Sequence, residues 1–218
     1  QVVLTDSDGR PAAQERELAN VAGTADGVLL WPVGDTPRRS AALLDLSSRG
    51  VPVVFVDRYL DSGFDHVVVD DEAGAYALTT HLLGLGHRRI AFVHAESTAL
   101  SSVRLRHRGY RTAMTEHENS TGDDLVLDLS RSDSLDALVD HLLAAPATAA
   151  FCVNDVVAVG LIGALERRGI RVPDEVSVAG FDALERLPEG RVLTSVRRAT
   201  GDMGRAAVRL LAARLRSC

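Results

Sequence analysis

The sequence predicts an α/β fold with doubly wound parallel sheet. Short apolar runs alternate with segments of helical periodicity along the whole chain, an order typical of parallel strands joined by crossover helices. The apolar runs lack a strict alternation of polar and apolar residues, which indicates strands that are buried on both faces. Helices are therefore expected on both sides of the sheet.

The expected strands are short and rich in valine, leucine, isoleucine and alanine. They comprise residues 2–5, 28–30, 51–56, 67–69, 90–93, 125–129, 149–153, 176–179 and 193–196. The helical segments between and after them comprise residues 11–22, 37–49, 72–85, 104–116, 132–145, 156–168 and 201–214. Most strands are thus followed by a helix, as βαβ units require.

Residues that favour helix ends mark several of these boundaries. Pro11 suits a first helical turn, and Gly50 suits the position just past a helix. Asp70 or Asp71 is expected to cap the helix at residues 72–85. Ser132 is expected to cap the helix that runs to residue 145.

The basic residues exclude several classes of function. The 218 residues carry a formal net charge of −6, and all 24 basic residues are arginine. Neither a Schiff-base lysine nor a P-loop lysine can therefore be present. Because phosphate binding needs clustered cations and no long basic run occurs, this chain is not expected to hold nucleic acid by itself.

The two cysteines, Cys152 and Cys218, do not form a disulfide framework and fit a reducing cytosol. Cys152 stands in an apolar run and is expected to be a small buried residue. The printed sequence contains neither a signal peptide nor a stretch suited to crossing a membrane, so we expect a cytoplasmic protein without a membrane partner.

Polar or aromatic residues follow nearly every predicted strand. They are Asp6, Trp31, Asp57, Asp70, His94, Asn154, Asp155 and Asp182. Asp and Asn also cap helices for purely local reasons, so any one of them has either interpretation. As a set, they lie where parallel sheets bind ligands, and carboxylates, an amide and an indole suit a polyhydroxylated ligand.

Five motifs extend this interpretation. They are GHRRIAFV at 86–93, RHRGY at 106–110, NDVVAVG at 154–160, VPDEVSVAGFD at 172–182 and LTSVR at 193–197. In order and spacing they resemble the effector-binding domain of LacI/GalR transcription regulators, across essentially the whole chain.

The resemblance implies two subdomains of the type I periplasmic-binding-protein-like fold, incomplete at both termini. They are residues 1–85 with 197–218, and residues 86–196, hinged near residues 85–86, 181–184 and 196–197. An effector is expected to bind between the two lobes and to control operator DNA binding by a helix-turn-helix outside this sequence. The resemblance also implies a homodimer, no cofactor, no metal and no catalytic residue.

The resemblance and the strand ends together give the candidate effector-binding residues. They are Arg106, Asp182, Asn154, Ser102, Trp31 and Asp57. The alternatives are a solvated position in an arginine-rich helix for Arg106, packing for Trp31 and a cap for Asp57. Asp155 is expected to be a helix cap.

Two departures from the family's pattern leave the identity of the effector open. Ala183 replaces a frequent second aspartate, and Ala73 replaces a carboxylate of some sugar-binding relatives. A sugar or sugar derivative is the expected effector, with a purine or a phosphorylated sugar as alternatives. His94, Glu96 and Cys152 do not form a zinc-enzyme pattern.

Two other classes compete with a regulator. An exported sugar-binding protein of a transport system shares the two-lobe fold, and the upstream sequence would distinguish it by a signal peptide. A nucleotide-dependent enzyme is disfavoured because neither a GxGxxG nor a GxxxxGK[ST] motif occurs.

Overall fold

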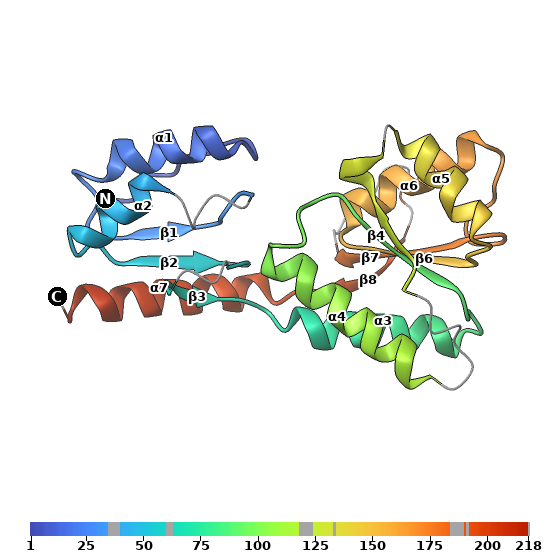
Figure 1. Ribbon diagram of the computed structural model, residues 1–218. Helices are drawn as coiled ribbons and strands as arrows, with labels where there is room; N and C mark the ends of the chain where they lie inside the picture. Colours follow the sequence, from blue (N-terminus) through green and yellow to red (C-terminus); the bar gives the residue numbers. More distant parts are fainter. Residues whose placement is uncertain are drawn as a thin grey trace. The chain divides into compact units, whose positions relative to one another are not determined.

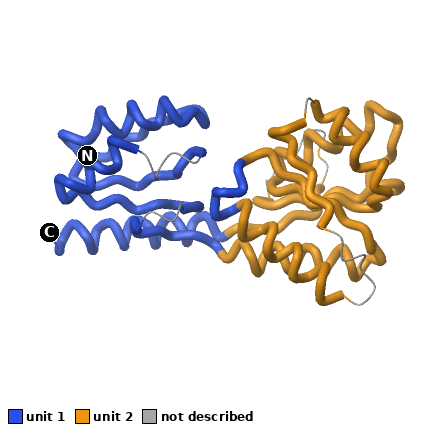
Figure 2. Tube along the Cα trace, viewed as in Figure 1, with its two compact units in different colours: residues 1–69, 97–102, 199–218 blue, residues 70–96, 103–198 orange. Residues whose placement is uncertain are grey.

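The computed structural model describes residues 1–34, 40–59, 63–117, 124–132, 134–183, 190 and 192–217. The chain forms two compact units, which Figure 2 distinguishes by colour. Unit 1 comprises residues 1–69, 97–102 and 199–218, and unit 2 comprises residues 70–96 and 103–198.

Unit 1 contains a three-stranded parallel sheet in the order β1-β2-β3. Its strands are β1 (Val28–Leu30), β2 (Val53–Val56) and β3 (Asp65–Val67). Helices α1 (Pro11–Val21) and α2 (Ala41–Ser48) pack together over one face, and α7 (Thr200–Leu215) lies along the other, as in Figure 1. Unit 1 is therefore an α/β layer with helices on both sides of its sheet.

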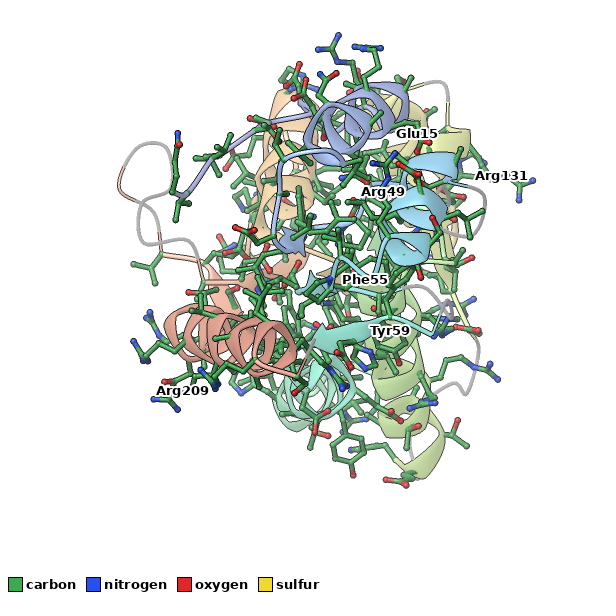
Figure 3. The ribbon with its side chains drawn as sticks, turned by 90° about the vertical axis from the view of Figure 1, so that its left-hand side faces the viewer. Glu15, Arg49, Phe55, Tyr59, Arg131 and Arg209 are labelled. Carbon is green, nitrogen blue, oxygen red and sulfur yellow. The ribbon has the colours of Figure 1, made fainter. Side chains whose placement is uncertain are left out.

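The core of unit 1 forms where α1 and α2 meet the sheet. Leu18, Leu43 and Leu46 pack there against Val53 and Phe55. Figure 3 shows Phe55 inside the unit and Arg209 on the outer side of α7. Side chains along a strand point to alternate faces, so Val53 and Phe55 of β2 both face this core.

Local capping sets the ends of α2. The Ser40 hydroxyl accepts a hydrogen bond from Leu43 N at 3.0 Å, and Glu15 of α1 accepts one from Ala42 N at 2.8 Å. Gly50 has a φ of 74° past the C-terminal end, a conformation that glycine adopts without steric cost. The expected start at residue 37 lies outside the described residues.

An ion pair in unit 1 links helix α7 to strand β3. Arg214 of α7 donates to both Asp65 carboxylate oxygens, at 2.6 and 2.9 Å. This hydrogen bonding and the nearby positive charge hold the pKa of Asp65 below its usual value. The C-terminal helix is therefore tied to β3, which lies far from it in the sequence.

Unit 2 contains a five-stranded parallel sheet in the order β5-β4-β6-β7-β8. The strands are β4 (Ile90–His94), β5 (Val126–Asp128), β6 (Ala149–Cys152), β7 (Ser177–Asp182) and β8 (Thr194–Arg197). The helices are α3 (Asp71–Gly84), α4 (Ser101–Glu116), α5 (Leu135–Ala144) and α6 (Asp155–Arg167), with a short 3-10 turn, η2 (Leu129–Arg131). Helices α3 and α4 cover one face of the sheet, and α5 and α6 cover the other (Figure 1).

Two of the three inner strands of unit 2, β4 and β6, are buried along their whole length. All residues of β6 and the first four of β4 have no solvent exposure. Strands buried on both faces need apolar residues at every position, and this explains the continuous apolar runs in the sequence. The predicted doubly wound parallel architecture is confirmed.

Gly109 allows α3 and α4 to cross at close range. A Cβ at this position would lie 2.2 Å from the Glu72 carbonyl oxygen and 2.9 Å from Tyr76 N. The next residue, Tyr110, is buried and donates its hydroxyl to the Ile90 carbonyl at 2.7 Å. The glycine and the aromatic residue of the RHRGY motif thus join α4 to α3 and to the first strand of the sheet.

Three local predictions were wrong. Residues 2–5 form no strand and pair with no described strand, and Val2 and Leu4 are almost fully exposed. High β propensity does not produce a strand without a hydrogen-bonding neighbour. The strand expected at 67–69 lies at Asp65–Val67, where it pairs with β2. Ser134, and not Ser132, caps α5, because its hydroxyl accepts from Ala137 N at 3.1 Å.

The division into units differs from the boundaries expected from the resemblance. Those boundaries assigned residues 71–85 to the first subdomain, whereas α3 packs against β6 and β8 and belongs to unit 2. The chain passes between the units at Val69–Asp70 and again at Arg198–Ala199. Residues 97–102, which lie inside the expected second subdomain, belong to unit 1.

Gly109→Ala is expected to lower the free energy of unfolding by at least about 2 kcal/mol, because the new methyl group must push two helix backbones apart. Gly163→Ala in α6 is the matched control, since its Cβ would meet only the Arg167 Nη1 atom, at 3.7 Å. The control should be neutral or stabilising by up to about 1 kcal/mol, as for any open helical glycine. Urea unfolding followed by circular dichroism measures both, and equal changes would contradict the close approach.

Candidate functional site

The carboxyl end of the sheet in unit 2 gathers polar side chains around Arg106. Arg106 is only 4% exposed. Its Nε donates to Asp71 Oδ1 at 2.8 Å, and its Nη1 donates to the Val153 carbonyl at 2.6 Å. Its guanidinium carbon lies 3.8 Å from the centroid of the Phe181 ring. The solvated position that was the alternative for Arg106 is therefore wrong, since this side chain is buried and paired.

Asp182 projects from a strained turn beside Arg106. Its carboxylate lies 2.9 Å from Arg198 Nε and 3.7 Å from Arg106 Nη1. Asp182 and Ala183 have φ values of 119° and 51°, and such conformations cost roughly 1–3 kcal/mol each for residues other than glycine. A strained backbone at the end of β7 therefore presents this carboxylate between two arginines.

The cap of helix α6 is Asn154 and not the expected Asp155. Asn154 caps α6, because its Oδ1 accepts from Val157 N at 2.9 Å. Asp155 is buried and accepts a hydrogen bond from the Ser195 hydroxyl at 2.6 Å. The cap predicted for Asp155 was therefore wrong. Asn154 lies next to Val153, the acceptor of Arg106, and its Nδ2 group makes no hydrogen bond within the described chain.

Ser102 lies one helical turn before Arg106 on α4. It is 1% exposed, and its hydroxyl has no hydrogen-bond partner among the described residues. A buried hydroxyl without a partner is costly and uncommon in proteins. Its position on the helix and its free hydrogen-bonding capacity are both features of a residue that binds a ligand.

Trp31 and Asp57 lie together in unit 1, at the ends of β1 and β2. Trp31 Nε1 donates to Asp57 Oδ2 at 2.8 Å, and the Arg58 guanidinium stands 4.6 Å from the centroid of the indole. Trp31 is 51% exposed although it is held by both neighbours. Asp57 caps none of the described helices, and its φ of 75° places it in the left-handed region that aspartate tolerates better than most residues. The structure thus fixes the orientation of a half-exposed indole ring.

Three charged residues of these clusters were not predicted from the sequence. Asp71 was considered only as a helix cap, but Asp70 fills that role through a 2.9 Å bond from Ala73 N. Arg58 and Arg198 were not singled out, although each directly follows a residue at or near a strand end. Proximity to the strand ends is the signal that could have found them.

No described helix is long and apolar enough to span a membrane. In the parts of the chain that the structure describes, no three histidine, cysteine or acidic side chains gather as a metal site.

Comparison with known proteins identifies the family. A family model described as a periplasmic binding protein-like domain matches residues 79–217. The chain belongs to this family, as a LacI/GalR-type effector-binding domain. It is 30% identical over 222 residues to the HTH-type transcriptional repressor PurR of Photobacterium profundum, across 99% of this chain and 65% of that repressor. The chain thus spans less than two thirds of the length of this relative.

Two solved regulators share the fold of this LacI/GalR-type domain. The transcription regulator CcpA of Lactococcus lactis has a TM-score of 0.83 at 27% identity, covering 99% of this chain and 79% of that one. The transcriptional regulator CelR, solved as a cellobiose complex, has a TM-score of 0.80 at 30% identity, covering 95% and 65%. These similarities favour a regulator over an exported transport protein.

Asp71→Ala is expected to lower the free energy of unfolding by about 3–5 kcal/mol, because the buried Arg106 cation loses its nearest counter-charge. The neighbouring Glu72→Ala is the control, since Glu72 pairs with the exposed Arg108. Its loss should stay under about 1 kcal/mol, as for other surface pairs. Equal losses in urea unfolding would show that Arg106 does not depend on Asp71.

Cys152 is expected to be unreactive in the native protein. Burial and the nearby Asp155 charge raise the pKa of its thiol. The thiol therefore stays protonated at pH 8, and only the thiolate is nucleophilic. In a Cys218→Ser variant, reaction with a disulfide reagent at pH 8 should be at least ~100-fold slower when folded than in urea. Similar rates in both states would contradict this burial.

Proposed function

We propose that this domain binds a small sugar or sugar derivative and thereby controls operator binding by a helix-turn-helix outside the printed sequence. The proposed ligand-binding residues are Arg106, Asp182 and Asn154 of unit 2, and Ser102, Trp31 and Asp57 of unit 1. The observation that carries the proposal is the Arg106–Asp182 pair, which is held at the strand ends by a buried framework and a strained turn.

The charges in unit 2 favour a ligand that is neutral and rich in hydroxyl groups. Arg106 and Arg198 are matched by Asp71 and Asp182, so the cluster has no uncompensated positive charge for a phosphate. A hydroxyl group both donates and accepts, and can therefore bond a carboxylate and a guanidinium together. The Asn154 amide and the Ser102 hydroxyl add neutral hydrogen-bonding groups. The cellobiose bound by CelR agrees with this class of ligand.

Regulation follows from differential binding, and no covalent step is involved. A ligand that binds one conformation of the domain more tightly than another shifts the protein towards that conformation. A coupling of about 1–3 kcal/mol is typical of allosteric systems and changes DNA affinity by roughly 5- to 150-fold. In this proposal the protein acts as a homodimer in the cytoplasm, where its operator lies.

A thermal-shift screen tests the proposal. Cellobiose, pentoses, sugar phosphates and nucleosides are added to the wild type, to Arg106→Ala and to Asp182→Ala. A ligand that binds the native state raises the melting temperature by mass action. A neutral sugar is expected to stabilise the wild type, and both variants should lose at least about tenfold in affinity because each removes a charged hydrogen-bonding group.

Arg111→Ala is the matched control on the same helix. Arg111 is exposed and lies 3.4 Å from Asp124, away from the Arg106 cluster. This variant should retain the full shift. A sugar that shifts all four proteins equally would show that it binds elsewhere, and a shift by a phosphorylated compound alone would replace the neutral sugar by an anionic ligand.

A further inference from the structure

The turn that presents Asp182 has a dedicated support. The Ala183 N–H donates to Ser195 Oγ at 3.0 Å, and the Ser195 hydroxyl donates to Asp155 Oδ1 at 2.6 Å. The hydroxyl therefore uses one acceptor site and its only proton in a short chain that ends on a buried carboxylate. A charged acceptor strengthens such a chain and fixes the direction of the hydroxyl proton.

The strained backbone of this turn requires such support. Asp182 and Ala183 both have positive φ, although neither is glycine. Such a conformation persists only where the surrounding structure holds it. The Ala183 amide belongs to the peptide bond that joins the two strained residues, and it donates to Ser195 Oγ.

Gly180 makes room for the carboxylate. A Cβ at residue 180 would lie 2.2 Å from Asp155 Oδ1 and 2.8 Å from Leu193 Cδ2. Gly180 pairs in register with Ser195, so the carboxylate approaches the sheet at the rung that carries the hydroxyl. Asp155 is also the first residue of α6, where the helix dipole stabilises a negative charge.

Strand β8 then serves the Asp182 carboxylate in two ways. Ser195 holds the backbone of the turn, and Arg198, just past the end of β8, holds the carboxylate itself at 2.9 Å. We propose that Asp155 and Ser195 form a positioning pair that keeps the Asp182–Ala183 turn left-handed and so places the Asp182 carboxylate on Arg198. The importance of this placement for ligand binding rests on the proposed function.

Hydrogen exchange by NMR tests the pair without any ligand. The two variants compared are Ser195→Val and Ser195→Thr. The valine and threonine side chains have nearly the same shape, and only threonine keeps the hydroxyl. Three quantities are followed: exchange at the Ala183 amide and at Arg106 Nε–H, and the chemical shift of Arg198 Nε, which reports the ion pair with Asp182. In the valine variant the Ala183 amide should exchange about tenfold faster, the effect of losing one hydrogen bond, and the Arg198 Nε shift should change. The threonine variant should resemble the wild type.

Arg106 Nε–H is the internal control, because it is held by Asp71 and not through the turn. If valine accelerates exchange at Ala183 and Arg106 equally, the hydroxyl acts only on global stability and the proposal fails. If valine leaves both the Ala183 exchange rate and the Arg198 Nε shift unchanged, the pair does not hold the turn. Should the valine variant not fold, Ser195→Ala is compared with threonine, with the same pattern expected.

Asp155→Ala is the second test of this chain of hydrogen bonds. It should accelerate exchange at the Ala183 amide and change the Arg198 Nε shift, because Ser195 loses the acceptor that orients its hydroxyl. An unchanged exchange rate and an unchanged shift would remove Asp155 from the pair. Because no ligand is present, these outcomes stay separate from those of the thermal-shift screen, which tests whether Asp182 binds the effector.

Discussion

The Arg106 guanidinium is buried among partners from separate parts of unit 2. It bonds Asp71 at the start of α3 and the Val153 carbonyl at the end of β6, and it covers the Phe181 ring of β7. Removing a cation from water is expensive, so each partner has to be in place before the burial is tolerated. Helix α4, which carries the arginine, is docked at the same time by Gly109 and Tyr110. The charged centre and the helix packing therefore constrain one another.

The proposed ligand-binding groups are preorganised. Asp182 is fixed by Arg198 and by its strained turn, and Trp31 is fixed by Asp57 and Arg58. Side chains already held in place lose little conformational entropy when a ligand binds. Because hydroxyl groups of a sugar both donate and accept, they can replace water at such groups without leaving a charge unpaired. The ion pairs therefore both balance the charges of these side chains and fix their positions.

Local sequence patterns predicted some features well and others poorly. The start of α1 and the end of α2 follow from Pro11 and Gly50, since these residues act through their own backbone. The strand expected at residues 2–5 failed because a strand depends on a neighbour that composition does not describe. The wrong choice of Asp155 over Asn154 as the cap of α6 has a similar cause. Both residue types cap helices equally well, and Ser195, which distinguishes them, lies 40 residues away.

The sequence by itself determined the parallel α/β class, the strand ends as the place of the polar residues, and the family motifs. Periodicity and short motifs are local properties, and they do not change with the path of the chain. Only the tertiary structure decided which of those residues meet. It brought Asp71 to Arg106 across 35 positions, set Arg198 on Asp182, and assigned α3 to unit 2. Hydrogen bonds and ion pairs act over a few ångströms, so their partners are fixed by packing and not by distance along the chain.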